Sequence, residues 1–178
     1  RSEEDLKKFF DLYEITAVRD KIGHRPYEYF KRMVDAYGSS DLLRIYIAEH
    51  EGEPLSGAIC IHYGNKTWYI YGASSNNKRN LMPNYAMQAE MIRWGFENGS
   101  KIYDFGGVFI LDKTNGLYKF KEGFCRREGA TEFIGEFDLV YNPLLYTGFA
   151  KVLPMVQRRR NRKHQQESVQ PAPKQEKE

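Results

Sequence analysis

The sequence predicts an α/β (α+β) fold in which helices flank a mixed, largely antiparallel sheet. Three patterns carry this prediction: alternating apolar residues over 43–71, a strong helical pattern over 84–98, and a short apolar run over 101–105. A helix that joins two strands of one sheet is the usual connection between parallel strands. We therefore expect a three-stranded antiparallel meander that is extended by one parallel strand.

Two helices are expected before the sheet. A capping box over residues 2–5 starts the first helix, whose apolar residues recur at helical spacing to about Val18. Pro26 suits the first position of the second helix, and Gly38 is expected to end it. The loop between the helices provides either a phosphate contact beside a helix N-terminus or solvated cations. Its basic residues are Arg19, Lys21 and Arg25.

The meander is expected to have strands at 43–47, 55–63 and 66–71, joined by tight turns. Strict alternation puts Tyr69 and Tyr71 on one face of the third strand, opposite Trp68 and Ile70. With Ser74 just beyond, the two tyrosines either line a peptide groove or stiffen the sheet as an aromatic pair. We interpret His62 as a hydrogen-bonded structural residue and not as a base.

Both apolar rows of the 84–98 helix are expected to be core, and Gly99 fits its C-terminal cap. A long strand is predicted over 131–140, with Glu136 and Asp138 on one face. An amphipathic helix kinked near Pro154 should follow. Together with the basic run after it, this helix either binds an anionic membrane or tRNA, or packs on the sheet as an ordinary C-terminal helix. That run contains Arg158, Arg159, Arg160, Arg162 and Lys163.

Composition limits the possible functions. The 178 residues suit one domain, followed by a basic, disordered tail over 157–178, and the net charge of +3 is too small to indicate nucleic acid by itself. Cys60 and Cys125 lack metal-site spacing, which fits a reducing cytoplasm. No apolar run reaches the ~20 residues of a membrane span, and the given sequence does not open with a signal-peptide pattern. Because the chain begins at Arg1, we expect a fragment of a longer protein.

The stretch from Tyr103 to Phe124 is the candidate site. Gly106 and Gly107 follow the short strand, and a glycine pair lets the backbone approach a ligand closely. Lys121 is flanked by aromatic residues, where its charge is screened less than in water. The stretch is either a site for an anion or a developing oxyanion, or a glycine turn followed by a helix with a solvated lysine.

Three ordered motifs resemble the Fem family of peptidyltransferases. They are Asp-Phe-Gly-Gly at 104–107, Gly-Leu-Tyr-x-Phe-Lys-x-Gly-Phe at 116–124 and Gly-Glu-Phe-Asp at 135–138. The resemblance covers about residues 1–156 and implies the second of two acetyltransferase-like (GNAT-like) halves, with the N-terminal half missing from this chain. It further implies transfer of an amino acid from aminoacyl-tRNA to the stem peptide of a peptidoglycan precursor.

The resemblance also implies roles for individual residues. Lys121 would stabilise the oxyanion, Phe120 would position it and stack on the tRNA acceptor end, and Glu136 is a weak candidate base. Arg25 and Tyr29 would contact the nucleotide-sugar part of the acceptor. We expect the other substrate-binding residues to be Tyr69, Tyr71, Ser74, Asp104, Gly106 and Gly107, and the tRNA contacts to be Arg158, Arg159 and Arg160.

No cofactor is expected. Acetyl-CoA enzymes of this fold hold the pyrophosphate on a glycine-containing loop before the crossover helix, whereas residues 76–84 contain no glycine. The expected partners are aminoacyl-tRNA and a UDP-linked or lipid-linked muramyl peptide. The expected location is the cytoplasm, or the inner face of the plasma membrane if the protein makes a peripheral membrane contact. Two alternatives stay open: a non-catalytic module that binds tRNA or cell-wall precursor, and an N-acyltransferase that uses another carrier.

Overall fold

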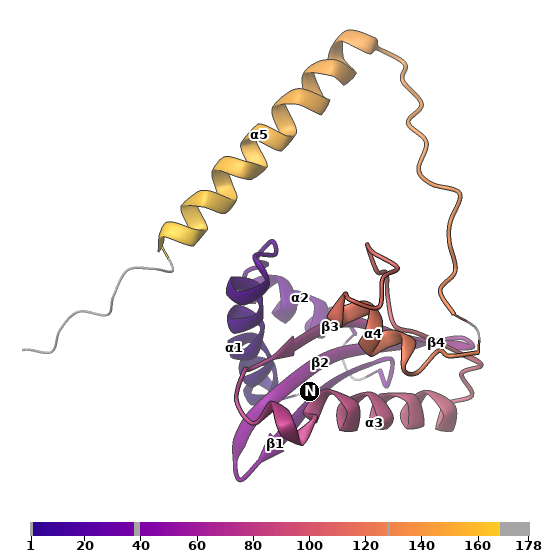
Figure 1. Cartoon of the computed structure of the whole chain (residues 1–178). Coiled ribbons are helices and arrows are strands. Elements are labelled where there is room, and N and C mark those ends of the chain that lie inside the picture. The colour runs from indigo at the N-terminus through magenta and orange to yellow at the C-terminus, as the bar shows by residue number, and fades with distance from the viewer. Residues whose placement is uncertain (1, 38–39, 128, 168–178) are drawn as a thin grey trace, which may run out of the picture. The chain divides into compact units, whose positions relative to one another are not determined.

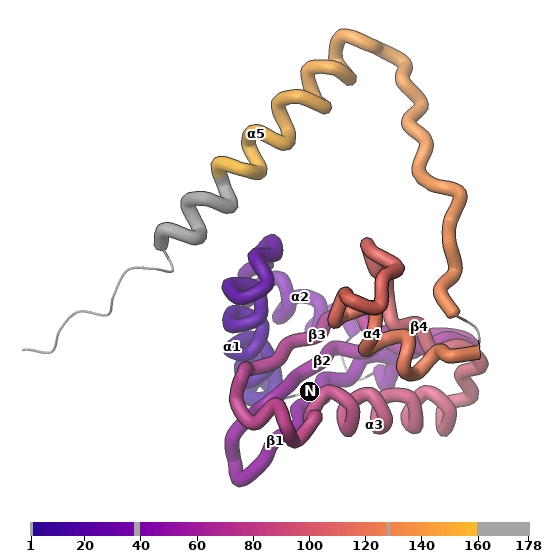
Figure 2. The backbone as a smooth tube through the Cα atoms, in the orientation of Figure 1, coloured from indigo at the N-terminus to yellow at the C-terminus, as the bar shows by residue number. Residues whose placement is uncertain are grey.

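The computed structural model describes residues 2–37, 40–127 and 129–167. It consists of two units, Arg1–Ala130 and Thr131–Glu178. In the first unit, helices lie on both faces of one sheet (Figures 1 and 2). Its elements are α1 (Glu3–Asp20), α2 (Tyr27–Tyr37), β1 (Leu43–His50), β2 (Glu53–Tyr63), β3 (Lys66–Ser74), the short 3-10 helix η1 (Arg79–Leu81), α3 (Pro83–Glu97), β4 (Ile102–Asp104) and α4 (Gly116–Glu122).

The sheet confirms the predicted meander and its parallel extension. The strand order is β1-β2-β3-β4, with antiparallel pairing between β1 and β2 and between β2 and β3. β4 runs parallel to β3, and α3 connects the two. The fold class expected from the sequence is therefore confirmed.

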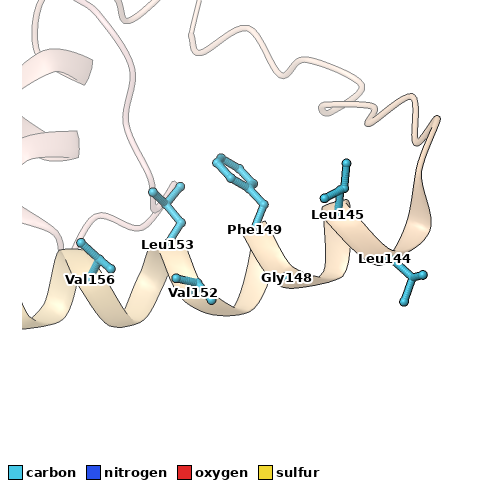
Figure 3. Close-up of a pocket in the computed structure, with 7 residues that line it drawn as sticks. All are labelled: Leu144, Leu145, Gly148, Phe149, Val152, Leu153 and Val156. Carbon is cyan, nitrogen blue, oxygen red and sulfur yellow. The ribbon is translucent and has the colours of Figure 1, made fainter.

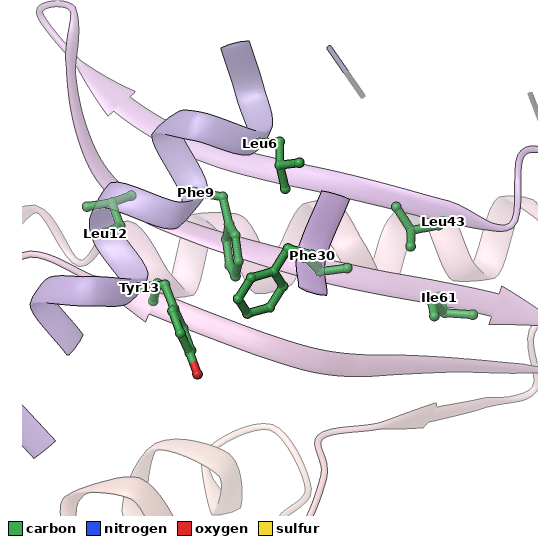
Figure 4. Close-up of a cluster of buried hydrophobic side chains, with 9 residues drawn as sticks. Leu6, Phe9, Leu12, Tyr13, Phe30, Leu43 and Ile61 are labelled. Atoms are coloured by element: carbon green, nitrogen blue, oxygen red, sulfur yellow. The ribbon is translucent and has the colours of Figure 1, made fainter. Parts of the chain in front are cut away.

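Helices α1 and α2 cover one face of the sheet. Phe9 and Phe30 are fully buried there, 5.4 Å apart in an edge-to-face arrangement, and they contact the apolar side of the strands (Figure 4). The predicted capping box is present, because the Ser2 side chain and the Asp5 side chain each accept the other's backbone N–H. Gly38, which was expected to end α2, lies outside the described residues.

Helix α3 covers the opposite face with a single row of side chains. Met87, Met91 and Trp94 are buried against β2, as predicted. The second predicted row is not core, since Tyr85 is 45% and Phe96 80% exposed. A helix lying on the outer surface of a sheet buries one stripe and leaves the other toward water, so the prediction that both rows are core was wrong.

A β-bulge in β3 overturns the predicted arrangement of the tyrosines. Cys60 pairs with Tyr69 but the preceding Ile59 pairs with Tyr71, which leaves Ile70 as an extra residue. An extra residue reverses the alternation beyond it. Tyr71 therefore packs with α1 and α2, while Tyr69 packs on the α3 face.

His62 has the structural role that the sequence predicted. Its side chain is buried, and Nδ1 lies 2.8 Å from the Ser100 hydroxyl and 3.2 Å from the Thr67 hydroxyl. Those two hydroxyls are 2.6 Å apart. The histidine thus ties the start of β3 to the turn before β4.

The second unit differs from expectation in two places. Residues 131–140 have no strand partner among the described residues, so the predicted strand is not formed, and Phe133 and Ile134 are about nine-tenths exposed. Helix α5 (Pro143–Glu167) contains Pro154 and continues through the basic run, where we expected a disordered tail. Arg and Lys are good helix formers, which suits this extension. The rest of the expected tail, 168–178, lies outside the described residues.

A shallow apolar groove runs along α5 (Figure 3). The groove is lined by Leu144, Leu145, Gly148, Phe149, Val152, Leu153 and Val156.

No described helix has the length and apolar character needed to cross a membrane.

Candidate active site

A glycine turn follows directly after β4. The Asp104 carboxylate accepts the Gly106 backbone N–H at 2.8 Å, which closes a tight turn at the end of the strand. Gly106 has a φ of +72°, in the left-handed region that disfavours residues with a Cβ. Glycine is therefore needed at 106 for its backbone conformation.

Lys121 is held against this turn. The Asn115 side chain caps α4 by accepting the Tyr118 N–H at 3.0 Å, and this fixes the start of the helix that carries Lys121. Lys121 Nζ donates to the Gly107 carbonyl at 2.9 Å and to the Gly106 carbonyl at 3.3 Å. An ammonium has three N–H donors. Among the described residues two of them have acceptors, the Gly106 and Gly107 carbonyls, and the third has none.

The charges around the turn are coupled. Burial lowers the pKa of Lys121, while the negative charge of Asp104 and the Cys125 thiol oppose this shift. Lys66, whose Nζ lies 2.6 Å from Asp104 Oδ2, is the main reason that the pKa of Asp104 lies below its usual value. Asp104 therefore pairs directly with Lys66 and also acts on Lys121.

An aromatic cluster fastens α4 to the sheet and to α3. The Phe124 ring lies 5.1 Å from Phe105, 5.4 Å from Tyr85 and 5.5 Å from Phe120. Phe120 also meets Tyr85 edge to face at 5.0 Å. Such edge-to-face and stacked pairs fix orientation as well as burying area. Phe120 thus supports the helix segment from which Lys121 projects.

Arg25, Tyr29 and Tyr71 form a second group. The Arg25 guanidinium lies 5.0 Å from the centre of the Tyr29 ring, a cation–π arrangement. The Tyr29 and Tyr71 hydroxyls are 2.9 Å apart. Desolvation and the Tyr29 hydroxyl raise the pKa of Tyr71 to about 12, so the Tyr71 phenol stays a neutral hydrogen-bonding group at physiological pH.

The structure places Tyr69 on the opposite face of the sheet from Tyr71, and it ties Ser74 to α1. Tyr69 lies on the α3 face, where burial raises its pKa to about 12 and its ring packs over Gly72. Ser74 is tied to α1, because its N–H donates to the Thr16 hydroxyl at 2.8 Å and its carbonyl accepts from Arg19 at 2.9 Å. The expected pair of groove tyrosines beside Ser74 is not formed.

The remaining predicted residues belong to the second unit. Glu136 is exposed on the extended segment, and Arg158 and Arg159 are exposed on α5. Arg160 is part of the same helix, but its side chain lies outside the described ones. Sequence reasoning missed Lys66 and the anchoring role of Tyr85. Lys66 could have been found only from the β3–β4 register, and Tyr85 only from its place in the first turn of α3.

Comparison with known proteins identifies the family. The FemAB family model matches residues 42–153. The chain is 40% identical to the UDP-N-acetylmuramoylpentapeptide-lysine N(6)-alanyltransferase of Weissella viridescens over 147 aligned residues. This alignment covers 83% of this chain and 43% of that protein. It is 44% identical to the lipid II:glycine glycyltransferase of Staphylococcus epidermidis over 119 aligned residues. This second alignment covers 65% of this chain and 28% of that protein. The chain thus spans less than half the length of these relatives.

Solved structures agree on the fold. A crystal structure of FemX superposes with a TM-score of 0.59 at 23% identity, over 69% of this chain and 47% of that one. A predicted acetyltransferase from Clostridium acetobutylicum, crystallised with acetyl-CoA, gives 0.59 at 14% identity, over 80% of this chain and 96% of that one. The two structures confirm the expected acetyltransferase-like fold. The matched region and the identity to curated relatives show that the chain belongs to the FemAB family.

Proposed function

We propose that this chain carries the oxyanion-stabilising half of an aminoacyltransferase that moves an amino acid from aminoacyl-tRNA to an amine of a muramyl stem peptide. The observation that carries the proposal is the Lys121 ammonium, which is held by the Gly106 and Gly107 carbonyls with one donor left over among the described contacts. The two curated relatives are named as a UDP-N-acetylmuramoylpentapeptide-lysine N(6)-alanyltransferase and a lipid II:glycine glycyltransferase, which supports the reaction class.

The chemistry needs one well-placed cation. The amine attacks the ester carbonyl, a C–N bond forms, and the carbonyl oxygen becomes an oxyanion. When that intermediate collapses, the C–O bond to the ribose breaks and the amide remains. A preorganised donor aimed at the oxyanion lowers the barrier by a few kcal/mol. In this scheme Lys121 is the donor, and Phe120 holds its helix segment in place and stacks on the acceptor end of the tRNA.

The acceptor precursor is assigned to the group on the α1 and α2 face. The Arg25 guanidinium suits a phosphate oxygen, and the Tyr29 and Tyr71 hydroxyls offer hydrogen bonds beside it. UDP-linked and lipid-linked muramyl peptides both carry a diphosphate, so this group is proposed to bind either form. Titration with each form, compared with an Arg25→Gln variant, tests the assignment.

The basic end of α5 is assigned to the tRNA. Arg158, Arg159 and Arg160 would neutralise backbone phosphates, so tRNA affinity should fall steeply with added salt. A peripheral contact with an anionic membrane is the competing role of this helix. Co-sedimentation with anionic vesicles in preference to tRNA binding would replace our assignment by that one.

The test is Lys121→Met in the full-length protein that contains this chain. We expect kcat for transfer from Ala-, Ser- or Gly-tRNA to fall by about 10²–10³, as for loss of an oxyanion donor. The variant should fold, because burial already disfavours the charge. Lys119→Met removes an exposed lysine of the same helix and should leave transfer unchanged. Near wild-type transfer by Lys121→Met would refute the role of Lys121. Precursor binding without any turnover by the intact protein would instead indicate a binding module.

A further inference from the structure

Lys66, the first residue of β3, makes an ion pair that the proposed reaction does not use directly. Its Nζ lies 2.6 Å from Asp104 Oδ2, and the two side chains are only 28% and 35% exposed. Water screens a pair with this burial less than it screens a surface pair. We propose that Lys66 is a positioning residue for Lys121 and acts through Asp104 and the glycine turn. This inference rests on the proposed function, since it explains how the oxyanion donor is held.

The strand register fixes Lys66 from two sides. In the parallel pairing, Trp68 lies opposite Asp104, and Lys66 lies two residues earlier on β3. Lys66 Nζ lies 5.0 Å from the centre of the Trp68 ring. The ammonium is therefore held between a carboxylate and an indole face, both on hydrogen-bonded strands. A lysine held in this way can fix the orientation of the carboxylate.

The other carboxylate oxygen passes this restraint to the turn. Asp104 Oδ1 accepts the Gly106 N–H at 2.8 Å, so the orientation of Asp104 determines where the turn lies. The Gly106 and Gly107 carbonyls then hold Lys121 Nζ at 3.3 and 2.9 Å. A continuous series of polar contacts thus leads from Lys66 to Lys121.

Lys66 also keeps Asp104 from capturing Lys121. Lys66 is the largest influence that lowers the pKa of Asp104, and Lys121 acts on the same carboxylate more weakly. Without Lys66, Lys121 would be the principal cation beside Asp104, and its ammonium would turn from the glycine carbonyls to the carboxylate. An ammonium paired with a carboxylate has less positive field left for an oxyanion. Lys66 therefore preserves both the position and the charge of Lys121.

The kinetic test compares Lys66→Met with a matched control. Lys78 has similar exposure, 34%, and pairs with Glu51 and Glu53 at 3.1 and 3.2 Å, but it lies beyond the other end of β3. In the full-length protein we expect Lys66→Met to lower kcat about 10- to 100-fold, the scale of a small misplacement, with KM for aminoacyl-tRNA nearly unchanged. Lys66→Arg should restore most of the rate, and Lys78→Met should match the wild type.

A spectroscopic test on the 178-residue chain separates this inference from the proposed function. Among the described residues, the ionisable groups that act on the pKa of Lys121 are Asp104 and Cys125. Loss of the Lys66 charge leaves Asp104 uncompensated, so the Lys121 pKa, followed by NMR of ¹³C-methylated lysines, should rise in Lys66→Met, and the Gly106 amide signal should shift. If Lys66→Met does not fold, Lys66→Gln takes its place with the same expectation. An unchanged Lys121 pKa and Gly106 signal would overturn the inference. Absence of transfer by the wild type would overturn only the proposed function.

Discussion

Replacing Gly106 by alanine tests whether the backbone of the turn sets the site. An ideal Cβ at 106 would lie 3.6 Å from the Tyr69 carbonyl oxygen and 3.8 Å from Lys121 Nζ, which are ordinary contacts. The cost must therefore come from the φ of +72°, and for a residue with a Cβ this is about 1–2 kcal/mol. For a chain of 178 residues we expect the melting temperature to fall by about 2–8 °C.

Gly107→Ala is the matched control for stability. A Cβ at 107 has no heavy atom within 4 Å and its φ is not in the left-handed region, so we expect an effect within about 0.5 kcal/mol. Gly106→Asn should fall between the two, because asparagine tolerates left-handed φ better than alanine does. Thermal and urea unfolding of the three variants provide the measurement. Equal stability of Gly106→Ala and Gly107→Ala would refute the strain argument, and with it the claim that the turn requires glycine.

Two further predictions concern Tyr69 and Asp104. A Cβ at Gly72 would lie 1.6 Å from the Tyr69 hydroxyl, so Gly72→Ala should cost about 1–3 kcal/mol in urea unfolding. Adding Tyr69→Phe should recover only part of this lost stability, because the Tyr69 ring carbon Cζ would still lie 2.5 Å from the new Cβ. If the stability losses of the two single variants simply add in the double variant, this contact is contradicted. The folded pKa of Asp104 is lowered, so its stabilising effect is complete above the ordinary carboxyl pKa and is lost as pH falls through the folded value. An NMR titration of the Gly106 amide should therefore have its midpoint below about 3.9, and a midpoint above that would exclude the ion pair with Lys66.

The meander could be predicted because its signals are local. Alternating apolar residues and the turns at Gly52 and Gly64, both with positive φ, determine three strands without knowledge of the tertiary structure. The bulge at Ile70 could not be predicted in this way. It exists only in the pairing of β3 with β2, and it places Tyr71 on the face opposite Tyr69. The prediction that Tyr69 and Tyr71 share one face relied on strict alternation through Ile70, and it was therefore wrong.

The candidate site was predicted only in part, for the same reason. The Gly106-Gly107 pair and Lys121 lie within one short stretch of sequence, and the structure brings them together. Lys66 and Asp104 lie on different strands, β3 and β4, and they become neighbours only through the parallel register. No sequence motif marks such a contact. The ion pair therefore could not be predicted without the alignment of the two strands.

Residues 131–140 show where a favourable pattern does not suffice. Their alternation favours a strand, but a strand is stable only when its backbone groups pair with another strand. Among the described residues this segment has no such partner, and Phe133 and Phe137 are 89% and 81% exposed. In the basic run, charge and polarity suggested disorder, whereas α5 extends through it to Glu167, which the helix propensities of Arg and Lys permit.

The charges around Lys121 also bear on how the attacking amine loses its proton in the proposed reaction. Asp104 is the carboxylate beside Lys121, but Lys66 at 2.6 Å and the Gly106 N–H at 2.8 Å occupy its two oxygens. Its pKa is lowered, and a carboxylate with a lowered pKa is a weaker base. The ribosyl oxygen that leaves must itself gain a proton, so transfer from the attacking amine to that oxygen satisfies both needs. On this reasoning the residues around the glycine turn contribute charge stabilisation and alignment, and the substrates carry the proton.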